Sequence, residues 1–341
     1  MDLENRQSFK SPTSSNPTGA TRVWDFPDIT LTSPYLAVSQ LLGEKDGFHV
    51  IPSAGARYYS HSVFEDKTAP QAGLVLGYAN TDLNFNYARG VNYPSPVVLQ
   101  GFLQDKDNIP GSVTLKKIKP EVVEHYEVGL THTWPETAKA NATFFHDDGR
   151  DRTRAYMGGP APGDRSWFNS SQSEYRIEGV ELSGSLTPVK NLDLFAGATF
   201  LQAWAKGDDG KTRTNLPYTP SFTFQGGFKW RFLENVQLSG DYQHLSDVYA
   251  ATSSRGGGAS NFSKLNSVNK LPDIDVVNLR LDYFFAWEPW LKDGKVFLAV
   301  DNVLDNKYAY AKEVGTGALA GHTGYYWMPG VSFMAGVELK F

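Results

Sequence analysis

Apolar and polar residues alternate along most of this chain. In residues 222–232 every second residue is Phe, Gly or Trp, and the residues between them are Thr, Gln, Gly, Lys and Arg. Residues 331–341 repeat the pattern, with Val, Phe, Ala and Leu at the odd positions and Ser, Met, Gly, Glu and Lys at the even ones. Because successive side chains of a strand point to opposite faces, each stretch predicts a strand with one apolar and one polar face.

The same pattern predicts about 13 strands along the chain. Residues 1–32 are interrupted by proline and are expected to be irregular. After residue 32, the connections between the predicted strands alternate strictly between short turns and long polar stretches. The predicted strands are 34–42, 48–59, 73–78, 83–88, 126–131, 138–145, 180–186, 192–200, 222–232, 236–243, 277–285, 296–300 and 331–341.

Alternating short and long connections are typical of membrane barrels, whose periplasmic turns are short and whose outer loops are long. A β-sandwich has no reason to follow that rule. The polar faces carry charged residues in strand after strand. Such faces can line the water-filled interior of a barrel, but they cannot pack against a second apolar layer as a soluble sheet would require. The sequence therefore predicts an all-β fold, a transmembrane antiparallel β-barrel, rather than a soluble sheet.

The strand count leads to a further expectation. If the last strand ends in the periplasm, counting back places the start of the first strand on the outer side, so residues 1–32 become an outer-loop remnant. A closed bacterial barrel has an even number of strands. We therefore expect residues 33–341 to be the carboxy-terminal part of a larger barrel.

Composition narrows the class of protein. The net charge of -5 argues against nucleic acid as a partner. The chain has no cysteine, which excludes disulfides and thiolate metal sites. No apolar run reaches the about 18 residues of a transmembrane helix. Residues 1–19 are polar and lack the pattern of a secretory signal, so we expect either a longer precursor or a protein that is not exported.

Several short motifs resemble one family, the TonB-dependent receptors, and they occur in the family's order. The motif at 300–308 is the most specific: it is similar to the family's Asn-Leu-Phe-Asp-x-x-Tyr, with Val-Leu in place of Leu-Phe. The matching stretches are Tyr87-Ala88-Arg89-Gly90 with Tyr93-Pro94 and Pro96, Lys119-Pro120-Glu121 with Tyr126-Glu127-Val128-Gly129-Leu130, Glu178-Gly179-Val180-Glu181, Leu216-Pro217-Tyr218-Thr219-Pro220, and Val300-Asp301-Asn302-Val303-Leu304-Asp305-Asn306-Lys307-Tyr308.

The resemblance implies a barrel of about 22 strands with a plug inside. It implies an outer-membrane receptor of a Gram-negative bacterium that takes up a scarce nutrient such as a ferric siderophore. The implied partners are the lipid bilayer, a small metal-chelate ligand and the TonB energy-coupling complex, which acts through the plug. Nothing in residues 1–32 resembles a plug or a coupling segment, so both are expected to be missing from this chain.

The end of the chain carries a second resemblance. Gly336, Leu339 and Phe341 are spaced like the carboxy-terminal signal of outer-membrane barrels, which implies recognition by the barrel-assembly machinery. The usual pattern has a polar residue where Met334 stands, so the match is incomplete.

Two groups of aromatic residues lie in connections expected on the outer side. Exposed aromatic side chains on loops often anchor ligands. The alternative is that they belong to the aromatic girdle at the outer membrane interface. The candidate ligand-binding residues are Tyr156, Trp167 and Phe168 in one connection and His322, Tyr325, Tyr326 and Trp327 in the last one.

No arrangement of residues predicts an enzyme, a cofactor site or a metal site. His146-Asp147-Asp148 at a strand end hints at a rim-active protease or lipase, but such a cluster is more often a solvated loop start. The acidic stretches 147–151 and 207–210 lack EF-hand spacing, and the histidines show no zinc pattern. Two rival functions stay open beside transport: a non-transporting barrel, such as a pore or an adhesin, and a rim-active barrel enzyme.

Overall fold

The computed structural model describes most of the chain as strands. The residues described are 7–9, 22–24, 28–44, 46–95, 118–157, 167–206, 213–250, 252–255, 270–287, 289–317 and 323–340. Within that part of the chain, no helix has the length and apolar character needed to cross a membrane.

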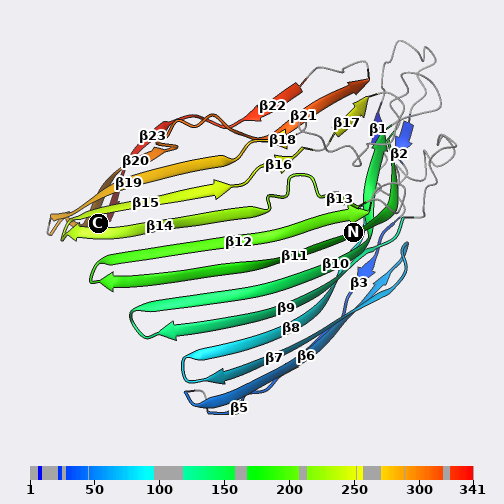
Figure 1. The fold of residues 1–341 in the computed structure, drawn as a ribbon, viewed down its shortest axis with the longest axis horizontal. Coiled ribbons are helices and arrows are strands. Elements are labelled where there is room, and N and C mark those ends of the chain that lie inside the picture. Colours follow the sequence, from blue (N-terminus) through cyan, green and yellow to red (C-terminus); the bar gives the residue numbers. More distant parts are fainter. Residues whose placement is uncertain are drawn as a thin grey trace.

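One antiparallel sheet of 16 strands dominates the fold, and neighbours in the sheet are mostly neighbours in sequence. Figure 1 shows it as a curved wall whose short turns gather at the end where the C terminus lies. Its long strands are β6 (Phe48–His61), β7 (Lys67–Tyr78), β8 (Thr81–Asn92), β9 (Glu121–Trp134), β10 (Ala138–Met157), β11 (Trp167–Val189), β12 (Leu192–Lys206), β14 (Phe222–Leu233), β15 (Val236–Leu245), β19 (Ile274–Trp287), β20 (Leu291–Asp301) and β23 (Ser332–Lys340).

Short strands complete the wall. β3 (Leu31–Thr32), β4 (Tyr35–Ser39) and β5 (Leu42–Gly43) all pair with β6, and β13 (Arg213–Asn215) pairs with β12. If β3 to β5 count as one interrupted strand and β13 is set aside, the 16 strands become the 13 that the sequence predicts. The all-β antiparallel prediction is confirmed.

Within the described residues, three small sheets lie outside this wall. β1 (Gln7–Phe9) pairs with β2 (Arg22–Trp24), inside the stretch that we expected to be irregular. β16 (Val248–Tyr249) pairs with β18 (Lys270–Leu271). β17 (Thr252–Arg255) runs parallel to β21 (Ala309–Gly317), which pairs with β22 (Thr323–Trp327).

The register of the wall places apolar side chains opposite one another. Ala142 of β10 lies across from Leu130 on one side and Leu182 on the other. Leu182 in turn lies across from Ala198 of β12, which lies across from Phe224 of β14. Because residues directly opposite share a face, these rows form one continuous surface, called here the apolar face. The alternate positions form the polar face.

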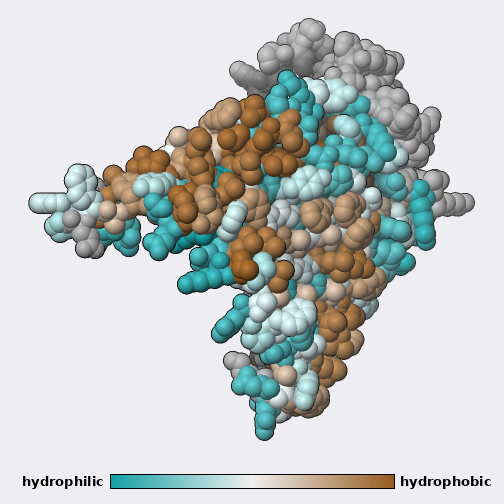
Figure 2. Space-filling view, turned by 60° about the vertical axis from the view of Figure 1, so that its left-hand side comes forward, coloured by the Kyte–Doolittle hydropathy of each residue, from teal (hydrophilic) through white to brown (hydrophobic). Residues whose placement is uncertain are grey.

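The apolar face is not covered by a second layer. Leu281 is 43% exposed and Phe333 73%, and Phe224 and Phe228 are also partly exposed. In Figure 2 apolar side chains gather over a broad area of the surface, with polar side chains beside them. A compact soluble sheet would bury these four residues, so the structure rules out that reading of the alternation.

The wall is open at two edges. Among the described residues, β23 at one edge pairs only with β20, and the edge pieces β3, β4 and β5 pair only with β6. On β23, the ring of Phe297 from β20 fills the space where a side chain at Gly336 would stand, its nearest carbon 2.4 Å from such a Cβ. This close approach gives a packing reason for glycine in the terminal motif. Leu339 lies on the same strand, and Phe341 lies outside the described residues.

The motif at 300–308 is a staple between strands at the end opposite the short turns. Asn302 is 3% exposed and adopts a φ of +52°. Its amide nitrogen donates to the carbonyls of Asn306 (2.9 Å) and Pro329 (3.3 Å), and its oxygen accepts from the Asn306 N–H. Asp305 accepts a hydrogen bond from the N–H of Val331 at the start of the last strand. The motif thus ties the end of β20 to the entry of β23.

A small cluster of rings closes the same end of the wall near β6 and β8. The His61 ring stacks on Tyr93 at 4.6 Å and accepts the N–H of Phe64. Phe64 and Ile118 are buried together, with Tyr93 packed against them. Tyr93 and Ile118 flank the long connection between β8 and β9, so the cluster joins the two ends of that connection.

A carboxylate holds the connection between β6 and β7. Asp66 accepts hydrogen bonds from the Tyr58 hydroxyl (2.6 Å) and from the His61 N–H (3.0 Å). These two bonds lower the pKa of Asp66 below its ordinary value. Because the folded-state pKa is lowered, the bonds contribute stability above the ordinary pKa and lose it as the pH falls through the folded value.

The staple predicts a specific loss of stability. We expect Asn302→Gly to lower the free energy of unfolding by about 1–3 kcal/mol, because it removes buried hydrogen bonds while glycine keeps the positive φ. The control is Asn191→Gly, at a turn residue that also has a positive φ, +72°, and whose side chain makes no hydrogen bond within the described part of the chain. Urea unfolding in detergent micelles, followed by tryptophan fluorescence, measures both. Equal effects of the two substitutions would contradict the staple.

Candidate functional site

Exposed aromatic rings gather on the hairpin of β21 and β22, called here the aromatic hairpin. Tyr325 and Trp327 stack at 5.1 Å, and the Nζ of Lys312 lies 5.3 Å from the centre of the Tyr325 ring. Tyr326 is 63% exposed and Trp327 is 62% exposed. Rings that present this much surface can pack against a flat apolar or aromatic ligand.

Hydrogen bonds close the base of the aromatic hairpin and tie it to the connection between β13 and β14. The hydroxyl of Tyr218 donates to the carbonyl of Lys312 at 2.9 Å, and the N–H of Met328 donates to the carbonyl of Tyr308 at 2.9 Å. Tyr308 and Tyr310 meet edge to face at 5.4 Å. The sequence placed Tyr325, Tyr326 and Trp327 in a loop, whereas the structure places them on a paired strand. His322 lies outside the described residues.

The second predicted group lies on an extension of β10 and β11. The sequence pattern predicts that Tyr156, Trp167 and Phe168 lie in a connection that starts near Asp147. In the structure both strands continue, and the backbone pairs Tyr156 with Phe168 and Met157 with Trp167. The side chains of these residues lie outside the described part, so their role as ligand contacts stays a prediction.

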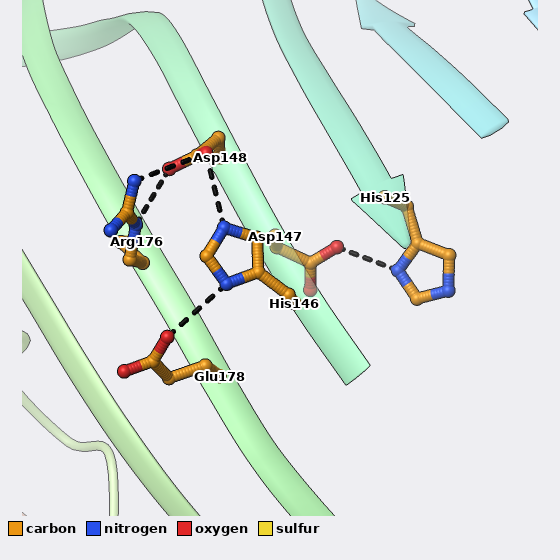
Figure 3. Close-up of polar contacts among 6 residues, drawn as sticks. All are labelled: His125, His146, Asp147, Asp148, Arg176 and Glu178. Carbon is orange, nitrogen blue, oxygen red and sulfur yellow. Dashed lines mark hydrogen bonds and ion pairs between the residues drawn. The ribbon is translucent and has the colours of Figure 1, made fainter. Parts of the chain in front are cut away.

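Two separate groups of charged side chains occupy the same level of the wall, as Figure 3 shows. In the first group, His146 meets Glu178 through Nδ1 (3.2 Å) and Asp148 through Nε2 (3.1 Å). Asp148 also accepts from Arg176, whose Nε is 2.8 Å away. These residues continue the alternation of the apolar face, since Phe144 precedes His146 and Val180 follows Glu178 at alternate positions.

The second group lies on the polar face. Asp147 is 2.7 Å from Nδ1 of His125. Glu127 accepts hydrogen bonds from the amides of Asn84 and Asn86, both at 3.1 Å. Side chains of this kind hydrogen-bond well to water or to a polar partner, so the polar face at this level is suited to an aqueous lumen.

This geometry does not favour the rim-active enzyme. His146 and Asp147 point to opposite faces, so they do not form a pair. Both ring nitrogens of His146 lie near carboxylates, which leaves neither free to take a proton from a nucleophile. Within the described ranges, no group of three or more His, Cys, Asp or Glu side chains could hold a metal ion.

Sequence reasoning missed some of the ionic residues. Arg176, Glu124 and His125 were not singled out, and Glu178 was noted only as part of a motif. The alternation itself contained a usable signal. Counting back from Val180 in steps of two, the same face of the strand carries Glu178 and then Arg176. Following each apolar stripe beyond its last apolar residue would have found the group.

A family comparison identifies the architecture. A model of the family described as "TonB dependent receptor-like, beta-barrel" matches residues 2–303. No curated protein matches the chain.

Solved structures share the fold at low sequence identity. A mutant of the ferric enterobactin receptor PfeA from Pseudomonas aeruginosa has a TM-score of 0.67 and 15% identity, and the match covers 90% of this chain and 44% of that one. The copper transporter OprC has a TM-score of 0.64 and 16% identity, covering 93% and 49%. The siderophore receptor PiuA from Acinetobacter baumannii has a TM-score of 0.61 and 13% identity, covering 91% and 43%. The chain spans less than half the length of these structures.

The Asp148–Arg176 pair predicts a measurable coupling. In a double-mutant cycle of Asp148→Asn and Arg176→Gln we expect about 1 kcal/mol, because the hydrogen bonds are charge-assisted but partly exposed. The coupling should fall in high salt. The control cycle uses Asp293 and Lys340, which are 3.9 Å apart and about three-quarters exposed, and should show no coupling. Urea unfolding measures both cycles, and equal coupling in the two pairs would contradict the geometry.

Proposed function

The chain belongs to the TonB-dependent receptor β-barrel family, and on that basis we propose that it forms part of the wall of a transporter in the outer membrane of a Gram-negative bacterium. Proteins of this family are receptors of that membrane. The observation that carries the proposal is the uncovered apolar face, which is continuous across the strands from β8 to β23. Lipid is the surrounding that stabilises such a face.

The open edges support a larger barrel. Unpaired backbone groups at β23 and at the edge beside β6 cost several kcal/mol each in hydrocarbon, which is why membrane sheets close. The solved relatives are more than twice as long as the matched part. The proposal therefore places residues 33–341 in the carboxy-terminal part of a barrel of about 22 strands, with further strands between the two edges. A plug inside it would contact TonB.

The proposed cargo is a scarce metal in chelated form. Among the similar structures, one is named as a ferric enterobactin receptor, one as a siderophore receptor and one as a copper transporter. The aromatic hairpin offers the exposed rings of Tyr326 and Trp327 at the end from which the long connections leave. Among such cargoes we propose a ferric siderophore, whose organic shell the rings would contact.

Single introduced cysteines can test which end of the wall faces the cell exterior, because the chain has no cysteine of its own. Tyr326→Cys lies on the aromatic hairpin, and Trp290→Cys lies in the turn between β19 and β20, where the side chain is 79% exposed. On intact cells we expect a membrane-impermeant maleimide to label the first variant at once, and the second only after the outer membrane is permeabilised. The opposite order would refute the proposed orientation.

Ligand contact is tested by Tyr326→Ala with Trp327→Ala. We expect uptake of radioactive iron, supplied as catecholate and hydroxamate chelates, to fall about tenfold for the chelate that the protein carries, because stacked rings anchor ligands. The matched control is Tyr78→Ala, an aromatic residue that is 70% exposed at the short-turn end. If cells lacking the protein took up every chelate tested as well as the wild type, the pore or adhesin would replace the transporter.

A further inference from the structure

The apolar face changes character before its strands end. On β10 the alternation runs from Ala142 and Phe144 to His146 and Asp148, and on β12 it runs from Phe200 to Gln202 and Trp204. The strands on either side change at the same level. The charged residues at this level, with the ring of Trp204, are called here the ionic belt. Its members are Arg89, Glu124, His146, Asp148, Arg150, Arg176, Glu178, Trp204 and Arg213.

Most charges in the belt are paired within it. Arg89 lies 2.8 Å from Glu124, and Arg150 lies 3.6 Å from the same carboxylate. Further along, Arg176 and His146 share Asp148, as described above. The pairs form two groups, one across β8, β9 and β10 and the other across β10 and β11. Both groups draw residues from β10, so together they form a band across four neighbouring strands.

Trp204 stands between two guanidinium groups at the end of the band. Arg176 lies directly across from it in the register, with its Cζ 5.6 Å from the ring centre. Arg213 on β13 has its Cζ 4.2 Å from the same ring. The side chain of Arg213 is exposed, and no carboxylate within the described residues pairs with it. This arrangement presents positive charge on both sides of an indole.

The level of the belt matches the edge of a hydrocarbon layer. From Ala138 to His146 on β10 the apolar stripe covers about 26 Å along the strand at about 3.3 Å per residue. A strand tilt of about 40° reduces this to about 20 Å, close to the apolar band of about 25 Å in membrane barrels. At that height a protein meets lipid headgroups, where Trp is enriched. Arginine suits phosphate there because its fork of donors matches phosphate oxygens.

We propose that the ionic belt binds the phosphate groups of outer-leaflet lipids, with Arg176 and Arg213 as the main contacts beside Trp204. The inference rests on the proposed function, because it takes the apolar face as the surface in contact with lipid. The ion pairs of Arg89 and Arg176 hold the guanidinium groups in place, and N–H donors that these pairs leave over would bind the phosphate. Arg213 supplies the charge that no described carboxylate neutralises.

The test compares lipid binding by arginines on the two faces. Arg176→Gln with Arg213→Gln removes the proposed contacts. The control is Arg280→Gln on the polar face, because Arg280 also pairs with an aspartate, Asp282 at 2.8 Å, and also lies over a ring, Phe297 at 4.0 Å. Arg213→Gln alone breaks no described ion pair, so it tests the site even if the double variant folds poorly.

The measurement is native mass spectrometry of the protein, released from vesicles of phosphatidylcholine that contain phosphatidic acid as the phosphomonoester probe. We expect about tenfold weaker retention of phosphatidic acid by the double variant, a smaller loss for Arg213→Gln, and wild-type retention for Arg280→Gln. Retention equal to wild type in both belt variants would overturn the proposal, as would an equal loss in the control.

Two further outcomes separate the possible sources of failure. If inorganic phosphate displaces the probe as readily as added phosphatidic acid does, the site binds free anions and the lipid assignment is wrong. If the wild-type protein does not insert into the vesicles, the proposed function fails. Insertion of the wild type with unchanged lipid retention in the belt variants overturns the belt alone.

Discussion

The structure depends on one constraint: each strand of the wall must keep apolar side chains on one face and polar side chains on the other. A shift of one residue in any pairing would exchange the two faces of that strand. In a membrane barrel, a charged residue turned toward lipid near the midplane costs about 2–4 kcal/mol. The register from Leu130 through Ala142 and Leu182 to Ala198 is therefore held by the surroundings of the wall as well as by its hydrogen bonds.

The two ends of the wall differ in how their connections are held. At the end where the C terminus lies, the turns between strands are short and need few side-chain contacts. At the other end the chain must leave and re-enter the wall, and there the staple of Asn302 and the ring cluster of His61 and Tyr93 tie strands together. Residues of the motifs that resemble the family's pattern thus have a structural role in this chain. That role is separate from binding a ligand.

Much of the wall could be predicted from sequence because its signal is local. The period of two in residues 222–232 and 331–341 is visible in any short window, and β14 and β23 lie there. The extension of β10 and β11 beyond Asp147 could not be read in this way. Its residues are mostly polar on both faces, and cross-strand contacts such as Asp148 with Arg176 depend on register.

The candidate site was predictable only in part for the same reason. Aromatic residues in long connections are visible in a sequence, so Tyr325 to Trp327 could be named as candidates, but their placement on a paired hairpin could not be predicted. His146 and Asp147 are neighbours in sequence and look like a catalytic pair. Only the strand that contains them separates them, because it sends consecutive side chains to opposite faces.

Spin labelling along β14 can show which face of the wall meets lipid and which meets water. Single cysteines at each position of Phe222–Leu233, labelled in the membrane-embedded protein, report access to oxygen dissolved in lipid and to a nickel complex dissolved in water. The account predicts that oxygen access rises and falls with a period of two, high at 224 and 228 and low at 225 and 229. Equal access at neighbouring positions, or high oxygen access at 225 and 229, would contradict it.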